Sequence, residues 1–133
     1  MSSDEIRVPG WPAPRGYANG RTGRGRPVHV AGQIGWDDQG EMATGMVDQF
    51  ARAVDNVIAV VRAGGGEVSD IATMTVFVTD IEAYRSSVKA IGGAWRGSMG
   101  RHFPAMTLVA VSALVEPRAL VEIQATAYIG GGP

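Results

Sequence analysis

The 133-residue chain is predicted to fold as an α+β protein, a two-layer sandwich with two helices on one face of a single sheet. Two segments repeat apolar residues at helical spacing, and several shorter ones are rich in β-branched residues or alternate apolar with polar residues. Each helix is apolar on one side only, so both must cover the same sheet. The length suits one domain. We assign residues 1–133 to that domain and expect residues 1–13 to be loosely ordered.

The first 27 residues are rich in Gly, Pro and Arg. Asn19-Gly20 and the glycines that follow are turn signals, which predict short strands joined by a hairpin near residues 17–30. Four clustered arginines raise the alternative of a nucleic-acid-binding tail: Arg15, Arg21, Arg24 and Arg26. We favour a solvated hairpin, because Tyr17 is the only aromatic residue interleaved with them.

A strand over residues 28–36 and a turn at DDQGE lead to the first helix, which follows Thr44. Gly64–Gly66 ends this helix, as glycine commonly does at a C-terminus. A phosphate-binding loop is a poor interpretation of these glycines, because neither a Walker lysine nor a following helix N-terminus is present. The apolar stripe of the helix comprises Val47, Phe50, Ala51, Val54, Ile58 and Val61.

The second half of the chain predicts a strand, a helix and two further strands. The β-branched residues 71–80 indicate a buried strand. The second helix starts at Asp80 and ends at Gly97–Gly100. Residues 105–114 and 119–129 are the last strands. The stripe of the second helix comprises Ile81, Tyr84, Val88, Ile91 and Trp95.

The last strand alternates strictly, so its two faces have different roles. The face that suits the helices carries Val121, Ile123, Ala125 and Ala127. The opposite face carries Leu120, Glu122, Gln124, Thr126 and Tyr128. Because this second face mixes polar with apolar groups, we expect it to contact another subunit.

Composition excludes several classes of protein. Hydrophobic residues make up 45% and charged residues 19%, and the net charge is −1, so no overall field favours nucleic acid or a membrane surface. Cysteine is absent, which excludes disulfides, thiol nucleophiles and cysteine zinc sites. The two histidines, His29 and His102, are far apart in sequence, so we predict no metal site, and we expect no cofactor. With neither a signal peptide nor a spanning segment in view, we expect a cytoplasmic protein.

Over residues 14–130 the chain resembles the RidA/YjgF family, also called the endoribonuclease L-PSP family. The matching motifs, in order, are RGYANG, VAGQIGWD, AVDNVIAVVRAGGGEVSDIATMTVFVTDI, FPAMTLVAV and LVEIQATAYI. The resemblance implies a chorismate-mutase-like subunit with a mixed sheet. It also implies a homotrimer around a central barrel, with small-molecule clefts between subunits.

Members of this family hydrolyse reactive enamines and imines to 2-oxo acids and ammonia. An arginine after the Pro-Ala of the FPA motif holds the substrate carboxylate, a glutamate on the last strand positions water, and a tyrosine lines the cleft. By this resemblance Tyr17 matches the tyrosine, and Gly32, followed by Gln33, matches the glycine that approaches the ligand. The arginine position is occupied by Met106 and the glutamate position by Gln124.

Both departures affect the chemistry. Methionine cannot bind a carboxylate, and glutamine can orient a water but cannot accept its proton. The candidate catalytic residues are therefore Gln124 and Glu122, which lies two positions earlier on the same strand face. The resemblance then implies a divergent member that does not act as a standard 2-imino acid deaminase.

Several residues have two interpretations. Arg101 or His102 could replace the lost cation, or could simply be solvated. Met106 suits an apolar pocket for a flat or aromatic ligand. Glu122 could act in acid–base chemistry, or could form an ion pair across the interface with Arg101 or Arg118.

Three functions remain open at this stage. The first is deamination of an enamine, an imine or a related small metabolite. The second is a non-catalytic trimer that binds a small molecule in the same clefts. The third, ribonuclease or translation inhibitor, ranks last, because the sequence shows no histidine pair, basic cleft or stacking platform for RNA.

Overall fold

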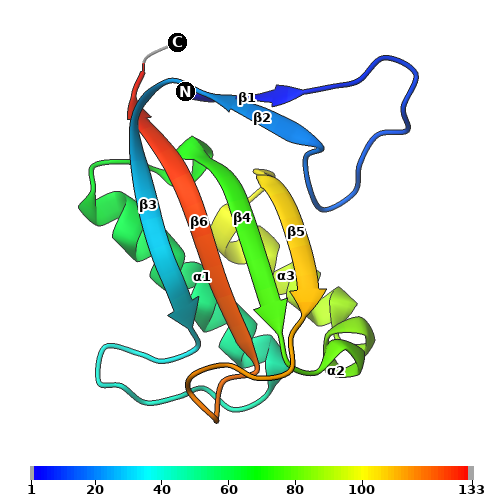
Figure 1. Ribbon diagram of the computed structural model, residues 1–133, viewed down its shortest axis with the longest axis vertical. Helices are drawn as coiled ribbons and strands as arrows, with labels where there is room; N and C mark the ends of the chain where they lie inside the picture. The colour runs from blue at the N-terminus through cyan, green and yellow to red at the C-terminus, as the bar shows by residue number, and fades with distance from the viewer. Residues whose placement is uncertain (1, 132–133) are drawn as a thin grey trace.

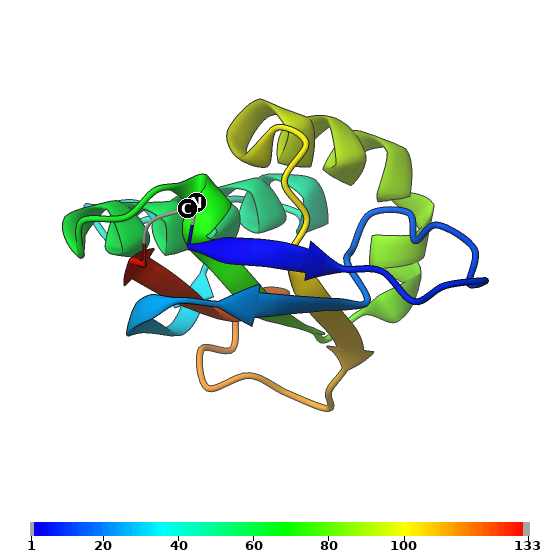
Figure 2. The same ribbon diagram turned by 90° about the horizontal axis from the view of Figure 1, so that it is seen from above.

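The computed structural model describes residues 2–131 and shows an α+β fold with helices on one face of a mixed sheet (Figure 1). Figure 2 shows the two layers and the face of the sheet that no helix covers. None of the helices within residues 2–131 combines the length and apolar character needed to span a bilayer. The elements are β1 Ser3–Ile6, β2 Gly20–Gly23, β3 Gly25–Ile34, α1 Met46–Ala63, η1 Val68–Asp70, β4 Ile71–Val78, α2 Ile81–Ser86, α3 Val88–Met99, β5 Ala105–Ala110 and β6 Val121–Gly130.

The main sheet has the strand order β3-β6-β4-β5. β6 runs antiparallel to both of its neighbours, whereas β4 and β5 are parallel. A parallel pair needs a long crossover, and α2 and α3 supply it. β4 ends at Val78 and β5 ends at Ala110, both earlier than predicted. The last bond between them runs from Val111 N–H to the Val78 carbonyl (2.8 Å), and a loop then returns the chain to β6.

The core lies between the sheet and the helices. The predicted helix-facing side of β6 is confirmed: Val121, Ile123, Ala125 and Ala127 are at most 6% exposed. Most of the predicted α1 stripe is buried as well, although Val47 and Ala51 are only partly covered. The predicted glycine end of α1 is confirmed, since Gly65 has φ +98° and Gly66 N–H bonds to the Val61 carbonyl at 3.0 Å.

The second predicted helix is broken at Ser87, so the described chain has three α-helices where two were predicted. Ser87 (φ −111°, ψ 8°) is both the C-cap of α2 and the N-cap of α3. Just before it, Ser86 Oγ donates to the Ala83 carbonyl at 3.2 Å. Such side-chain bonds compete with continued helical pairing, which a stripe of apolar spacing does not reveal.

The predicted hairpin near residues 17–30 is wrong. β2 pairs with β1, with Ser3 opposite Gly23, so residues 3–6 form one strand of a two-stranded ribbon. The chain then bends at Gly25, which has φ +101° and approaches the Ile129 carbonyl too closely for a Cβ. The glycines therefore mark a bend into β3 and not a hairpin turn.

Arg21 of β2 fastens this ribbon to the rest of the molecule. Its Nε donates to Ser3 Oγ at 2.8 Å, and its Nη1 donates to the Phe103 carbonyl at 3.2 Å. The ribbon is thereby connected to the segment that enters β5. Burial lowers the pKa of Arg21, but a guanidinium remains charged.

A single buried polar side chain connects α1 to the start of β6. Gln49 is 3% exposed. Its Nε2 donates to the carbonyls of Ala43 and Arg118, both at 3.1 Å, and its Oε1 accepts from Leu120 N–H at 2.7 Å. All three backbone groups would lose their partner if the amide were removed.

We therefore expect Gln49→Leu to lower the free energy of unfolding by about 2–4 kcal/mol, since buried polar groups left unpaired are costly. Urea unfolding followed by circular dichroism measures the change. Asp48→Ala, at an exposed position one residue earlier, is the matched control and should stay close to the unsubstituted protein. Equal midpoints for both variants would contradict this role.

Candidate functional site

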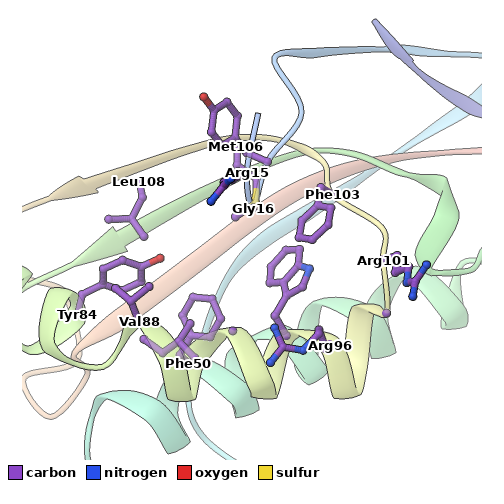
Figure 3. Close-up of a pocket in the computed structure, with 15 residues that line it drawn as sticks. Arg15, Gly16, Phe50, Tyr84, Val88, Arg96, Arg101, Phe103, Met106 and Leu108 are labelled. Atoms are coloured by element: carbon purple, nitrogen blue, oxygen red, sulfur yellow. The ribbon is translucent and has the colours of Figure 1, made fainter. Parts of the chain in front are cut away.

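A cavity of about 490 Å³ lies at the β5 edge of the sheet, between α2, α3 and the loop that joins β1 to β2 (Figure 3). Its floor includes Met106 and Leu108, the helix-facing side chains of β5. β5 is an edge strand, so the helices cover these two side chains only partly. The cavity therefore lies where the helices do not fully cover the sheet.

Aromatic side chains form the inner wall. The rings of Trp95 and Phe103 stack with centroids 6.0 Å apart and planes 3° apart. Phe50 lies 6.4 Å from Trp95 and 6.3 Å from Tyr84, in tilted arrangements. Burial raises the pKa of Tyr84, which keeps its phenol protonated. A wall of this kind suits a flat apolar group.

Three arginines, Arg15, Arg96 and Arg101, also line the cavity, and no acidic side chain does. Within residues 2–131 none of the three makes an ion pair or a side-chain hydrogen bond. Two of them adjoin glycines with positive φ, Gly16 (+79°) and Gly100 (+63°). The electrostatics of the cavity therefore favour an anion.

The structure places several predicted residues together here. Tyr17, which is 42% exposed, lines the cavity with Met106 and Arg101. The bond from Ala18 N–H to the Pro104 carbonyl (2.9 Å) holds the Tyr17 segment beside the FPAM segment. These residues are far apart in sequence, and this local bridge brings them to one site.

His102 has a different environment from the other predicted residues of its segment. Its Nε2 lies 2.7 Å from the Ile71 carbonyl, and its own carbonyl accepts from Trp95 Nε1 at 3.2 Å. It lines a second cavity that also includes Tyr17 and Arg101. Burial is the main cause that lowers the pKa of His102, so the ring is neutral at pH 7.

The other predicted residues lie away from the cavity. A Cβ at Gly32 would collide with the Glu122 carboxylate, so these two residues are in close contact beside an irregularity in the β3–β6 pairing. Gln124 lines a shallow pocket of about 180 Å³ with Thr75 and other residues of the uncovered sheet face. Gln33 Nε2 donates to the Ala31 carbonyl at 3.1 Å.

Glu122 has no ion-pair partner within residues 2–131. Arg118 instead bonds to Glu116 at 2.8 Å, which holds the pKa of that carboxyl below its ordinary value. Glu122 and Gln124 point to the uncovered sheet face, whereas Met106 points to the helices. One subunit therefore does not bring all the predicted site residues together.

Sequence reasoning missed the aromatic wall and two of the arginines. Tyr84 and Trp95 were assigned to the core stripe of a helix, and Arg15 to a solvated hairpin. One usable signal was Gly92, a glycine inside that helix that lines the cavity, where an added Cβ would lie 3.6 Å from Arg96 Nη1. Among residues 2–131, no three His, Asp or Glu side chains converge as metal ligands would.

Comparison with known proteins gives a consistent result. The family model for endoribonuclease L-PSP matches residues 12–129. A 2-iminobutanoate/2-iminopropanoate deaminase of Dermatophagoides farinae is 31% identical over 126 residues, which cover 93% of this chain and 94% of that protein. The Rid-family protein YyfB of Yersinia pestis has a TM-score of 0.84 at 27% identity, covering 97% of this chain and 100% of that one. The yjgF gene product of E. coli has a TM-score of 0.70 at 32% identity, covering 96% and 99%.

The neutral state of His102 predicts a pH dependence of stability. Because its pKa in the folded chain is below the ordinary 6.5, the unfolded chain binds the proton more readily. The free energy of unfolding should therefore decrease as the pH falls through and below 6.5. Hydrogen bonds lower the pKa values of Asp4 and Asp37. Protonation of these two carboxyls therefore changes the free energy of unfolding only below their ordinary pKa of 3.8.

Urea unfolding at a series of pH values between about 7 and 5 measures this slope. His102→Asn should flatten it, whereas His29→Asn, which removes the other histidine, serves as the control. An unchanged slope in His102→Asn would show that another group binds the proton.

Proposed function

The chain belongs to the endoribonuclease L-PSP family, also called RidA/YjgF, and on that premise we propose that it hydrolyses the C=N bond of a reactive imine or enamine. The observation that carries the proposal is the meeting of Tyr17 and Met106 at one cavity, through the bond between Ala18 and Pro104. This is the place where the family resemblance puts the reacting group. The deaminase name of the Dermatophagoides relative supports the same class of reaction.

The reaction asks little of the protein. Water adds to the imine carbon to give a carbinolamine, which then expels ammonia and leaves a 2-oxo acid. An imine already reacts with water, so catalysis requires a held substrate and a positioned water. We assign the water to Glu122, the carboxylate that lies against Gly32, with Gln124 as an orienting amide on the same strand face.

Met106 distinguishes this chain from a standard 2-imino acid deaminase. A thioether cannot replace a bidentate guanidinium, so a substrate bound only through a carboxylate at this position would be held weakly. Instead, Met106 and Leu108 present apolar surface to the cavity. We therefore propose a substrate with a substantial apolar part. A trimer that binds such a molecule without turnover is the second candidate, favoured by Gln124 at the glutamate position.

We further propose that the working form is a homotrimer with the uncovered sheet faces packed around a central barrel and the ligand clefts between subunits. Glu122 and Gln124 point to that face, and Tyr17 and Met106 lie at the β5 edge, so the two groups need a neighbouring copy to form one cleft. Sedimentation equilibrium should return about three times the subunit mass of 13.9 kDa. A monomer at micromolar concentration would refute both the trimer and the shared cleft.

The hydrolysis is tested with imines that an amino-acid oxidase generates in place, while semicarbazide competes for the intermediate. The protein should speed ammonia release from at least one of a panel of neutral, aromatic and acidic amino acids. Glu122→Gln should reduce the acceleration about 100-fold, which is typical for loss of a general base. Glu82→Gln, an exposed change on α2, is the matched control. No acceleration over buffer across the panel would leave the binding trimer as the better reading.

A further inference from the structure

We propose that Arg15 supplies the cation that position 106 lacks, and that the aromatic cavity selects an anionic substrate with an aromatic side chain. The inference rests on the proposed function, because it names the substrate class for the same cleft. It adds a residue and a chemical class that the family resemblance does not supply.

The side chains that line the cavity carry an excess of positive charge. They include three arginines and no acidic side chain, although the whole chain has a net charge of −1. Unpaired guanidinium groups beside an apolar wall attract anions, and a carboxylate can accept two parallel hydrogen bonds from one of them. A neutral ligand of the same shape would leave this charge unused.

Position favours Arg15 among the candidate cations. Arg15 and Met106 line the same cavity (Figure 3), and the bridge between Ala18 and Ala105 places the loop that carries Arg15 beside the start of β5. Gly16, with φ +79°, makes the turn that follows Arg15, and a side chain there would be strained. The bond from Ala18 to Pro104 then anchors the loop two residues further on.

The other cations are placed less well. Arg101 lies beyond Phe103 in Figure 3, with its guanidinium directed away from the aromatic side chains. His102 is neutral, and its Nε2 is hydrogen-bonded to the Ile71 carbonyl. Arg96 stands on α3 at the opposite wall from Met106. Of the three arginines, Arg15 belongs to the loop that the Ala18–Ala105 bridge holds beside Met106, so we assign the role of the missing cation to it.

Shape indicates the aromatic part of the substrate. The cavity of about 490 Å³ is within the usual range for small-molecule sites. Trp95 is only 6% exposed, so an incoming ring would meet mainly the half-buried rings of Phe103 and Tyr84. A short aliphatic side chain would make fewer contacts with these rings, so it should bind more weakly.

Phenylpyruvate and 2-oxobutanoate serve as probes, because both are 2-oxo acid products that bind without turnover. Isothermal titration of the full chain should show phenylpyruvate binding at least tenfold more tightly. Arg15→Gln should weaken phenylpyruvate at least tenfold, whereas Arg85→Gln, which removes an exposed arginine paired with Glu82, should leave it unchanged. The double variant Arg15→Gln with Met106→Arg should recover affinity by returning a cation to the cleft.

A second variant tests the aromatic part. Gly92→Leu places a side chain in the cavity while improving helix propensity. It should weaken phenylpyruvate tenfold or more and change 2-oxobutanoate little. Unchanged phenylpyruvate binding in Arg15→Gln, equal affinity for the two probes, or no phenylpyruvate binding at all would each overturn the inference.

The binding assay also separates this inference from the hydrolysis. Arg15-dependent binding of phenylpyruvate without ammonia release from any imine would uphold the substrate class and refute the hydrolysis. Ammonia release that is insensitive to Arg15→Gln, for aromatic and aliphatic imines alike, would uphold the hydrolysis and refute the role of Arg15.

Discussion

The strict alternation of β6 is the constraint on which the rest of the structure depends. This strand lies inside the sheet, between β3 and β4, and one of its faces is fully buried against the helices. A slip of one residue would bring Glu122 and Gln124 into the core and expose Val121 and Ile123, at a cost that no local contact could offset. The buried amide of Gln49, which bonds to Leu120 N–H, helps to hold that register at the start of the strand.

The candidate site exists because the same packing is incomplete at β5. An edge strand has a neighbour on one side only, and here the helices cover Met106 and Leu108 only partly, which leaves space beside them. Aromatic side chains border that space, and Gly92 lines it without a side chain of its own. The site is thus a consequence of where the sheet ends, and the loop between β1 and β2 completes its wall.

The apolar floor of the cavity belongs to a strand, whereas Arg15 belongs to a loop, and this difference affects how substrate specificity can change. The floor residues belong to β5 and share the stability of the core, whereas Arg15 belongs to a loop that is anchored at Ala18. A cation on such a loop can be gained or lost without disturbing strand pairing. The proposed carboxylate contact of Arg15 would therefore change the substrate without changing the fold.

The sequence by itself determined the layers. Periods of 3.6 and 2 residues are local properties, so the stripe of α1, the glycine end of α1 and the two faces of β6 were all readable. Position 106 and Tyr17 were identified by the resemblance of their motifs. Tertiary structure alone decided that β2 pairs with β1, that the second helix breaks at Ser87, and that Arg15 lines the same cavity as Phe103 and Met106. Each of these depends on contacts between distant residues, and a local pattern does not record which distant partner will be present.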